Sequence, residues 1–139
     1  MKLRALSIFI AISMVATVSV EAACSKRDAV GTWVSFQNNI TTPEGLHVGK
    51  CTLDVIKDNS WTGNCQLYFQ NSTYSNPGAQ FPVGGTVTVN RDCSAEIVMK
   101  WNGGEGTHYV QISNNKMGWS GIWNNSYGNW GNVTAVRRK

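Results

Sequence analysis

The sequence predicts an all-β domain, specifically an eight-stranded antiparallel up-and-down barrel with two disulfides. Three observations support this fold class. Short runs rich in β-branched and aromatic residues follow one another, with Gly, Asn, Asp or Pro between them. After the first 23 residues, no run of ten or more has convincing helical periodicity. The connections between the runs alternate between long and very short, which indicates a meander with one tight end and one loop-rich end.

Residues 1–23 are typical of a secretory signal peptide. A short basic start precedes the apolar stretch Ala5–Val20, and Val20–Ala23 offers small residues for cleavage. The apolar stretch is too short for a transmembrane helix. A lipoprotein signal is the alternative, in which Cys24 would be acylated. We therefore expect a single barrel domain, residues 24–139, in a secreted or periplasmic protein.

The charge of the chain argues against a nucleic-acid partner. Lys and Arg together number 12 and Asp and Glu number 8, so the formal net charge is +4. Part of this excess lies in the terminal residues Arg137–Lys139, and the rest is scattered. A nucleic-acid backbone is bound by a basic stripe or patch, which this pattern lacks. We expect neither a nucleic-acid partner nor a membrane span, and the oligomeric state is not predicted.

The expected strands share β-branched or aromatic residues, and several of them alternate in polarity. Closure into a barrel is favoured over an open sheet because it removes exposed edges. A two-sheet sandwich is the alternative. In chain order, the expected strands are Val30–Gln37, Lys50–Ile56, Ser60–Phe69, Gly84–Val89, Cys93–Trp101, Thr107–Ser113, Lys116–Trp123 and Trp130–Arg138.

The connections place a binding site at one end of the predicted barrel. The short ones consist of residues that suit hairpin turns, and they are Lys57–Asn59, Asn90–Asp92 and Asn114–Asn115. The others are expected at the opposite end, which forms the mouth, and they are Asn38–Gly49, Gln70–Val83, Asn102–Gly106 and Asn124–Asn129. A ligand is expected at this mouth.

The cysteine spacing tests this layout independently. Cys51 and Cys65 are equidistant from Asp58, so a hairpin turning at Asp58 places them directly opposite each other, within disulfide reach. By elimination, Cys24 pairs with Cys93, and both are expected at the tight end. An even number of cysteines in an exported chain favours disulfides over zinc. No metal site is predicted.

Aromatic residues indicate both a filled interior and a binding surface. Five tryptophans share the sequence parity of the expected inward-facing residues: Trp33, Trp61, Trp101, Trp119 and Trp123. Toward the mouth, indole and phenol rings lie beside amide side chains, a combination that suits sugars and planar ligands. The candidate ligand-binding residues are Asn38, Tyr74, Trp123, Asn125, Tyr127, Asn129 and Trp130.

The segment Val30-Gly31-Thr32-Trp33, followed by a meander and a late basic residue, resembles the calycins: lipocalins, avidins and bacterial barrel-shaped protease inhibitors. The resemblance implies that Trp33 plugs the closed end, with Gly31 as a structural residue and a late Arg, Arg137 or Arg138, packed over the indole. The hairpin from Cys51–Val55 to Trp61–Asn64 is similar to one in avidins. This chain has Cys65 where avidins place a biotin-binding Tyr.

Catalysis has little support in the sequence. The two histidines, His47 and His108, are far apart in the chain, and the carboxylates show no paired arrangement that suggests acid–base work. We expect a non-enzymatic protein without a cofactor that binds a small molecule or glycan. The alternative is an inhibitor that blocks a secreted hydrolase, of protease or lysozyme type, with the loops Asn38–Gly49 and Gln70–Val83.

Four sequons for N-glycosylation occur, at Asn39, Asn71, Asn124 and Asn132. Whether they are used depends on the source of the protein.

Overall fold

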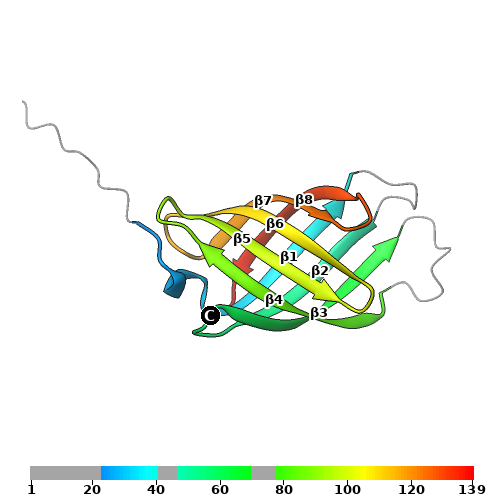
Figure 1. Ribbon diagram of the computed structural model, residues 1–139, viewed down its shortest axis with the longest axis horizontal. Helices are drawn as coiled ribbons and strands as arrows, with labels where there is room; N and C mark the ends of the chain where they lie inside the picture. The colour runs from blue at the N-terminus through cyan, green and yellow to red at the C-terminus, as the bar shows by residue number, and fades with distance from the viewer. Residues whose placement is uncertain (1–22, 41–46, 70–77) are drawn as a thin grey trace, which may run out of the picture.

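The chain forms a closed barrel in which every strand pairs with the next and β8 pairs with β1 (Figure 1). The computed structural model describes residues 23–40, 47–69 and 78–139. All neighbouring strands are antiparallel, so the predicted up-and-down barrel is confirmed. Within the described ranges, no helix is long and apolar enough to cross a membrane.

All the predicted strands are present, and one short 3₁₀ helix, η1, precedes them. The elements are η1 (Lys26–Ala29), β1 (Gly31–Asn39), β2 (His47–Val55), β3 (Ser60–Phe69), β4 (Gln80–Val89), β5 (Ser94–Trp101), β6 (Gly104–Ile112), β7 (Gly118–Asn125) and β8 (Trp130–Arg137).

The strands extend further toward the mouth than the sequence predicted. β4 begins at Gln80 rather than Gly84. It includes Pro82, which lies near the start of the strand, where a proline is tolerated. The predicted loop Asn102–Gly106 is wrong, since β6 begins at Gly104. A Cβ at Gly104 would lie 2.7 Å from the Trp101 indole, so this glycine provides room for packing within a strand rather than a loop.

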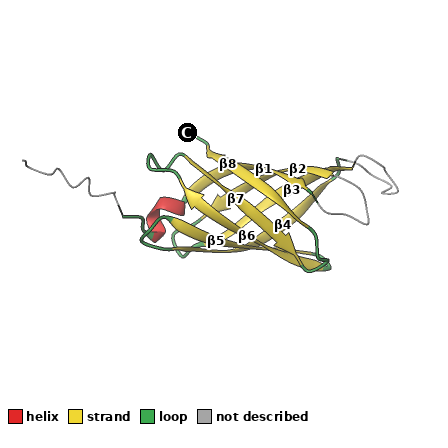
Figure 2. Ribbon diagram, turned by 90° about the horizontal axis from the view of Figure 1, so that it is seen from above, coloured by secondary structure: helices red, strands yellow, loops and turns green. Residues whose placement is uncertain are grey.

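One end of the barrel, which we call the closed end, carries η1 and the connections 56–59, 90–93 and 113–117 (Figure 2). The predicted hairpin turns are therefore at the predicted end. Each contains a backbone hydrogen bond between residues three apart, and each has a non-glycine residue with positive φ: Asn59 (66°), Cys93 (65°) and Lys116 (58°).

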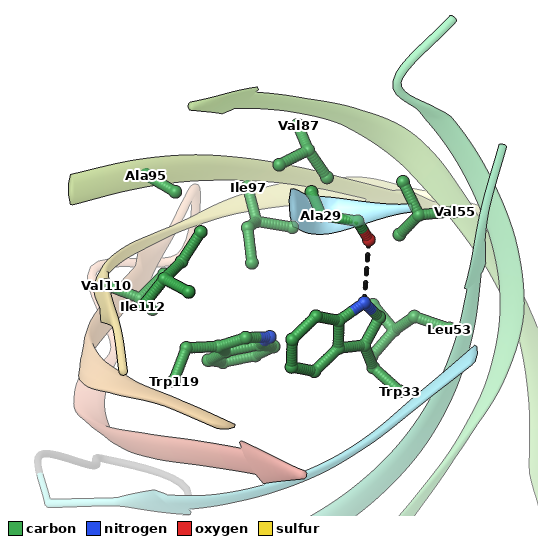
Figure 3. Close-up of a pocket in the computed structure, with 10 residues that line it drawn as sticks. All are labelled: Ala29, Trp33, Leu53, Val55, Val87, Ala95, Ile97, Val110, Ile112 and Trp119. Carbon is green, nitrogen blue, oxygen red and sulfur yellow. Dashed lines mark hydrogen bonds between the residues drawn. The ribbon is translucent and has the colours of Figure 1, made fainter. Parts of the chain in front are cut away.

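The barrel is filled at the closed end. Trp33 and Trp119 lie with their ring centroids 6.2 Å apart, and the Trp33 Nε1 donates a hydrogen bond of 2.7 Å to the Ala29 carbonyl (Figure 3). Only about 20 Å³ of space remains among the side chains there. We call this group the plug, and it comprises Ala29, Trp33, Leu53, Val55, Val87, Ala95, Ile97, Val110, Ile112 and Trp119.

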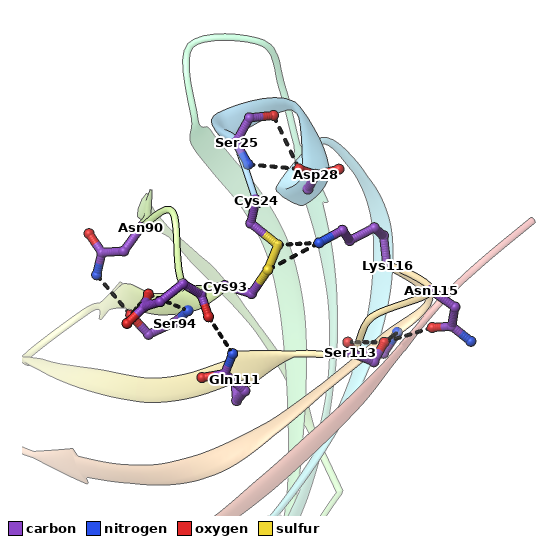
Figure 4. Close-up of a disulfide and its surroundings, with 12 residues drawn as sticks. Cys24, Ser25, Asp28, Asn90, Cys93, Ser94, Gln111, Ser113, Asn115 and Lys116 are labelled. Carbon is purple, nitrogen blue, oxygen red and sulfur yellow. Dashed lines mark hydrogen bonds between the residues drawn. A yellow bond between two sulfur atoms is a disulfide. The ribbon is translucent and has the colours of Figure 1, made fainter. Parts of the chain in front are cut away.

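Both predicted disulfides are present. Cys51 and Cys65 are register partners on β2 and β3, with Cα atoms 4.0 Å apart, and both side chains are buried inside the barrel. Cys24 and Cys93 are joined at the closed end, with Cα atoms 4.8 Å apart (Figure 4). Disulfides persist in oxidising compartments, so this pair of bridges indicates an extracellular or periplasmic environment.

The residue with positive φ in each closed-end turn also holds the segment around η1. Asn59 donates a side-chain hydrogen bond of 3.2 Å to the Lys26 carbonyl, and Cys93 forms the disulfide with Cys24. The Lys116 ammonium contacts the sulfurs of both Cys24 and Cys93 (Figure 4). Three turns from different hairpins therefore fasten one N-terminal segment over the plug.

Arg137 completes the closed end. Its guanidinium carbon lies 4.6 Å from the centroid of the Trp33 ring, and its Nη2 donates a hydrogen bond to the Asp28 carbonyl. The resemblance to calycins implied this contact between Trp33 and a late arginine. Gly31 has a φ of 133° and lies beside the Arg137 side chain, so both implied structural residues belong to this end.

Candidate functional site

The mouth half of the barrel contains a cavity of about 590 Å³. Its position follows from the plug, which occupies the other half of the interior. Apolar and aromatic side chains make up most of the lining, with a few amides and imidazoles. The lining residues are Gln37, His47, Cys65, Leu67, Ala79, Phe81, Pro82, Met99, Trp101, Asn102, Gly106, His108, Trp123, Asn125, Tyr127 and Asn129.

Two tryptophans form aromatic walls of this cavity. Trp123 is buried, and its Nε1 donates a hydrogen bond of 3.0 Å to the Asn38 carbonyl on β1. Trp101 is partly buried, with its ring centroid 6.3 Å from that of Tyr127. The Tyr127 hydroxyl donates a hydrogen bond of 2.6 Å to the Gly103 carbonyl. These contacts fix the aromatic rings before any ligand arrives.

Two polar residues, Gln37 and His108, lie deep in the cavity. His108 is 2% exposed, and its ring centroid is 6.2 Å from that of Trp119 in the plug. Gln37 is two inward-facing positions along β1 from Trp33, with Ser35 between them. Burial lowers the pKa of His108 to about 4, so the imidazole is neutral at physiological pH.

A second histidine lies nearer the mouth. The Nδ1 of His47 is 3.2 Å from the Asn39 side-chain nitrogen, and its ring centroid is 6.0 Å from that of Trp123. Asn39 is only 3% exposed, so the sequon at this residue is inaccessible in the folded barrel. Asn124 and Asn132 are exposed, and Asn71 lies outside the described residues.

The cavity lining carries no formal charge among the described residues. None of the side chains that line it is Asp, Glu, Lys or Arg. Asp58 and Asp92 have a lowered pKa because the hydroxyls of Ser60 and Ser94 donate hydrogen bonds to them. These two carboxylates are fully exposed in closed-end turns, away from the cavity. In the described part of the chain, no group of three His, Cys, Asp or Glu residues could hold a metal ion.

Four of the predicted ligand-binding residues line the cavity: Trp123, Asn125, Tyr127 and Asn129. Asn38 and Trp130 do not line it. Trp130 is 48% exposed, and the Asn38 side chain accepts a hydrogen bond of 2.9 Å from the Asn132 backbone. Strand alternation directs both outward. The remaining candidate, Tyr74, lies outside the described residues.

The polar residues deep in the cavity are not among the residues predicted from the sequence. Gln37 has the same parity as Trp33 on β1, and His108 is the register partner of Trp123 on β7. The odd number that Gln37 shares with the tryptophans could have identified it, whereas His108 is even-numbered and is placed inside only by its alternation with Val110 and Ile112 on β6.

Comparison with known proteins supports the barrel architecture alone. No protein-family model matches the chain, and neither does any curated protein sequence. A redesigned β-barrel of known structure has 13% sequence identity and a TM-score of 0.58, with 82% of this chain and 95% of that chain covered. The S-type phycobiliprotein lyase from Guillardia theta has 11% identity and a TM-score of 0.43, with coverages of 82% and 90%. The similarity to the redesigned barrel indicates the barrel fold and does not assign the chain to a calycin family.

Proposed function

We propose that this exported protein binds a small molecule in the mouth half of its barrel and does not convert it. The observation that carries the proposal is the cavity of about 590 Å³ above a filled plug. Small-molecule sites are typically concave, mostly apolar and about 300 to 1,000 Å³ in volume, with a few polar groups that orient the ligand. The lining described above has this composition.

Binding without conversion is favoured by the chemistry of the lining. Apart from the Tyr127 phenol, the titratable side chains among its described residues are His47 and His108. General acid–base catalysis usually requires a group whose pKa lies near the working pH and a partner that orients it. His108 is held neutral by burial, and the described lining contains no carboxylate that could orient either imidazole.

Tryptophan fluorescence provides a first test, because Trp101 and Trp123 line the cavity. The protein would be titrated with neutral aromatic compounds, soluble glycans and fatty acids. We expect saturable quenching by at least one small molecule. Silent fluorescence with every class, together with a stable complex with a secreted hydrolase, would contradict the proposal and support the inhibitor function instead.

A pair of variants locates the bound molecule. Leu67→Trp adds bulk inside the cavity, whereas Tyr68→Trp adds an indole at the next position of β3, which is 48% exposed on the outside. Calorimetric titration should show binding lost in the first variant and retained in the second. Equal binding by both would place the ligand elsewhere on the molecule.

A further inference from the structure

Two polar atoms in the wall of the cavity, at its deep end, have no hydrogen-bond partner among the described residues. They are the Oε1 of Gln37 and the Nδ1 of His108, and both are buried. A buried polar atom without a partner costs about 1 to 3 kcal/mol. Such atoms are rare in native proteins, and each requires a reason, such as an absent water or ligand. Both residues line the same cavity, which suggests a shared reason.

Both residues lie at the floor of the cavity, next to the plug. On β6, His108 is the first inward-facing residue beyond the plug residues Ile112 and Val110. On β1, Gln37 follows Ser35, whose buried hydroxyl also lacks a partner. A ligand that fills the cavity therefore lies against these two side chains with its leading end, while its body lies against Trp101 and Trp123. A turn of the Gln37 amide and of the His108 ring brings the unpartnered atoms toward the ligand.

The chemistry of the two side chains selects the kind of group that fits. A neutral imidazole offers one donor and one acceptor, and a Gln amide offers a carbonyl acceptor and an NH₂ donor. A carboxamide or hydroxyl matches them because it both donates and accepts. A carboxylate or ammonium group would be buried without an opposite charge, since the described lining has none, and burial of an unpaired charge is costly.

We propose that the floor of the cavity is a subsite for a neutral group that both donates and accepts hydrogen bonds, a carboxamide or hydroxyl, carried by a planar apolar ligand. Gln37 and His108 are the specificity-determining residues of this subsite. The proposal rests on the proposed binding function and adds the chemical class of the ligand. The burial that keeps His108 neutral is consistent with a neutral partner.

Three naphthalenes of nearly equal shape test the subsite: naphthalene-2-carboxamide, 2-isopropylnaphthalene and 2-naphthoate. Titration calorimetry at neutral pH would measure the affinity of the purified protein for each. We expect the carboxamide to bind at least tenfold more tightly than the isopropyl compound, because only the carboxamide pairs with the floor. The anionic naphthoate should bind most weakly.

Two variants assign the selectivity to the floor. Gln37→Met and His108→Leu each remove an unpartnered polar atom at similar size, so the fold should be retained. In each, the preference for the carboxamide over the isopropyl compound should fall at least fivefold. Tyr109→Leu is the matched control, since Tyr109 follows His108 on β6 and is 47% exposed outside the barrel. It should leave the preference unchanged.

The outcomes separate this inference from the proposed function. Equal affinity of the wild-type protein for the carboxamide and isopropyl compounds would overturn the subsite while leaving binding in place. An equal loss of selectivity in Tyr109→Leu would overturn the assignment to Gln37 and His108. Absence of binding by all three naphthalenes, with silent fluorescence across the wider panel, would contradict the binding function itself.

Discussion

The indole of Trp123 extends across Gly131 and donates its hydrogen bond to the Asn38 carbonyl, one strand further around the barrel. A Cβ at Gly131 would lie 1.7 Å from that carbonyl oxygen and 2.9 Å from the indole nitrogen. The same arrangement occurs at Trp61, whose indole extends past Gly85. Its Nε1 donates a hydrogen bond of 3.1 Å to the Val98 carbonyl. In each case the glycine provides the room that lets an indole lie against the barrel wall.

Gly131→Ala should therefore lower the free energy of unfolding by about 2 kcal/mol, through overpacking against β1 and displacement of Trp123. Gly84→Ala is the control, because its Cβ would meet only the Trp61 carbonyl at 3.2 Å, and it should cost less. Urea denaturation of both variants provides the comparison. Equal costs would show that the close approach at Gly131 relaxes freely.

The buried imidazole of His108 should make the protein less stable in acid. Its pKa is lowered to about 4 in the fold, from 6.5 when exposed, so below pH 6.5 the unfolded chain takes up a proton that the folded chain does not. The register partners Ile97 and Trp123 and the Trp119 ring are uncharged and cannot compensate. This group should remove roughly 3 kcal/mol of stability between pH 6.5 and 4.

Urea denaturation at pH 7 and pH 4 checks this linkage. In His108→Leu, the stability difference between the two pH values should shrink by roughly 3 kcal/mol. Tyr109→Leu should keep the full difference. An unchanged difference in His108→Leu would mean that other groups cause the acid sensitivity.

The disulfides should contribute unequally to stability. Cys24–Cys93 spans 69 residues and Cys51–Cys65 spans 14. In the chain-entropy model, the longer loop is worth about 4 kcal/mol and the shorter about 3. The double variant Cys24→Ala/Cys93→Ala should therefore lose about 1 kcal/mol more than Cys51→Ala/Cys65→Ala in chemical denaturation. The reverse order would show that packing of the inner disulfide outweighs chain entropy.

Arg137 should stabilise the closed end through the shape of its guanidinium as well as its charge. Arg137→Lys keeps the charge but loses the planar group over Trp33, and should cost about 1 to 2 kcal/mol. The adjacent Arg138 is exposed and makes its hydrogen bond to Thr32 through the backbone, so Arg138→Lys should change stability by less than about 0.5 kcal/mol. Thermal unfolding compares the two. Equal shifts would exclude a specific role for the stacking contact.

The sequence predicted the closed end well because local rules act there. The equal spacing of Cys51 and Cys65 from Asp58 determines a hairpin register, and the polar turn residues Lys57–Asn59 agree with it. Strand alternation also placed Trp33 and Trp123 in the interior, where the structure has them.

The mouth was predicted less well because its features depend on contacts between distant strands. Gly104 begins β6, and a Cβ there would meet the Trp101 indole, whereas composition alone suggests a loop. Trp130 looks equivalent to Trp123 as a loop neighbour but points outward. That Gln37 and His108 line one cavity depends on barrel closure, which joins strands far apart in the chain.

The most direct test of the account follows the tryptophan indole N–H signals by nuclear magnetic resonance during titration with naphthalene-2-carboxamide. Trp101 and Trp123 line the cavity, Trp33 lies in the plug, and Trp130 is exposed outside the barrel. We expect saturable shifts of Trp101 and Trp123, with Trp33 and Trp130 unchanged. Saturable shifts confined to Trp130 would contradict binding in the mouth half of the barrel.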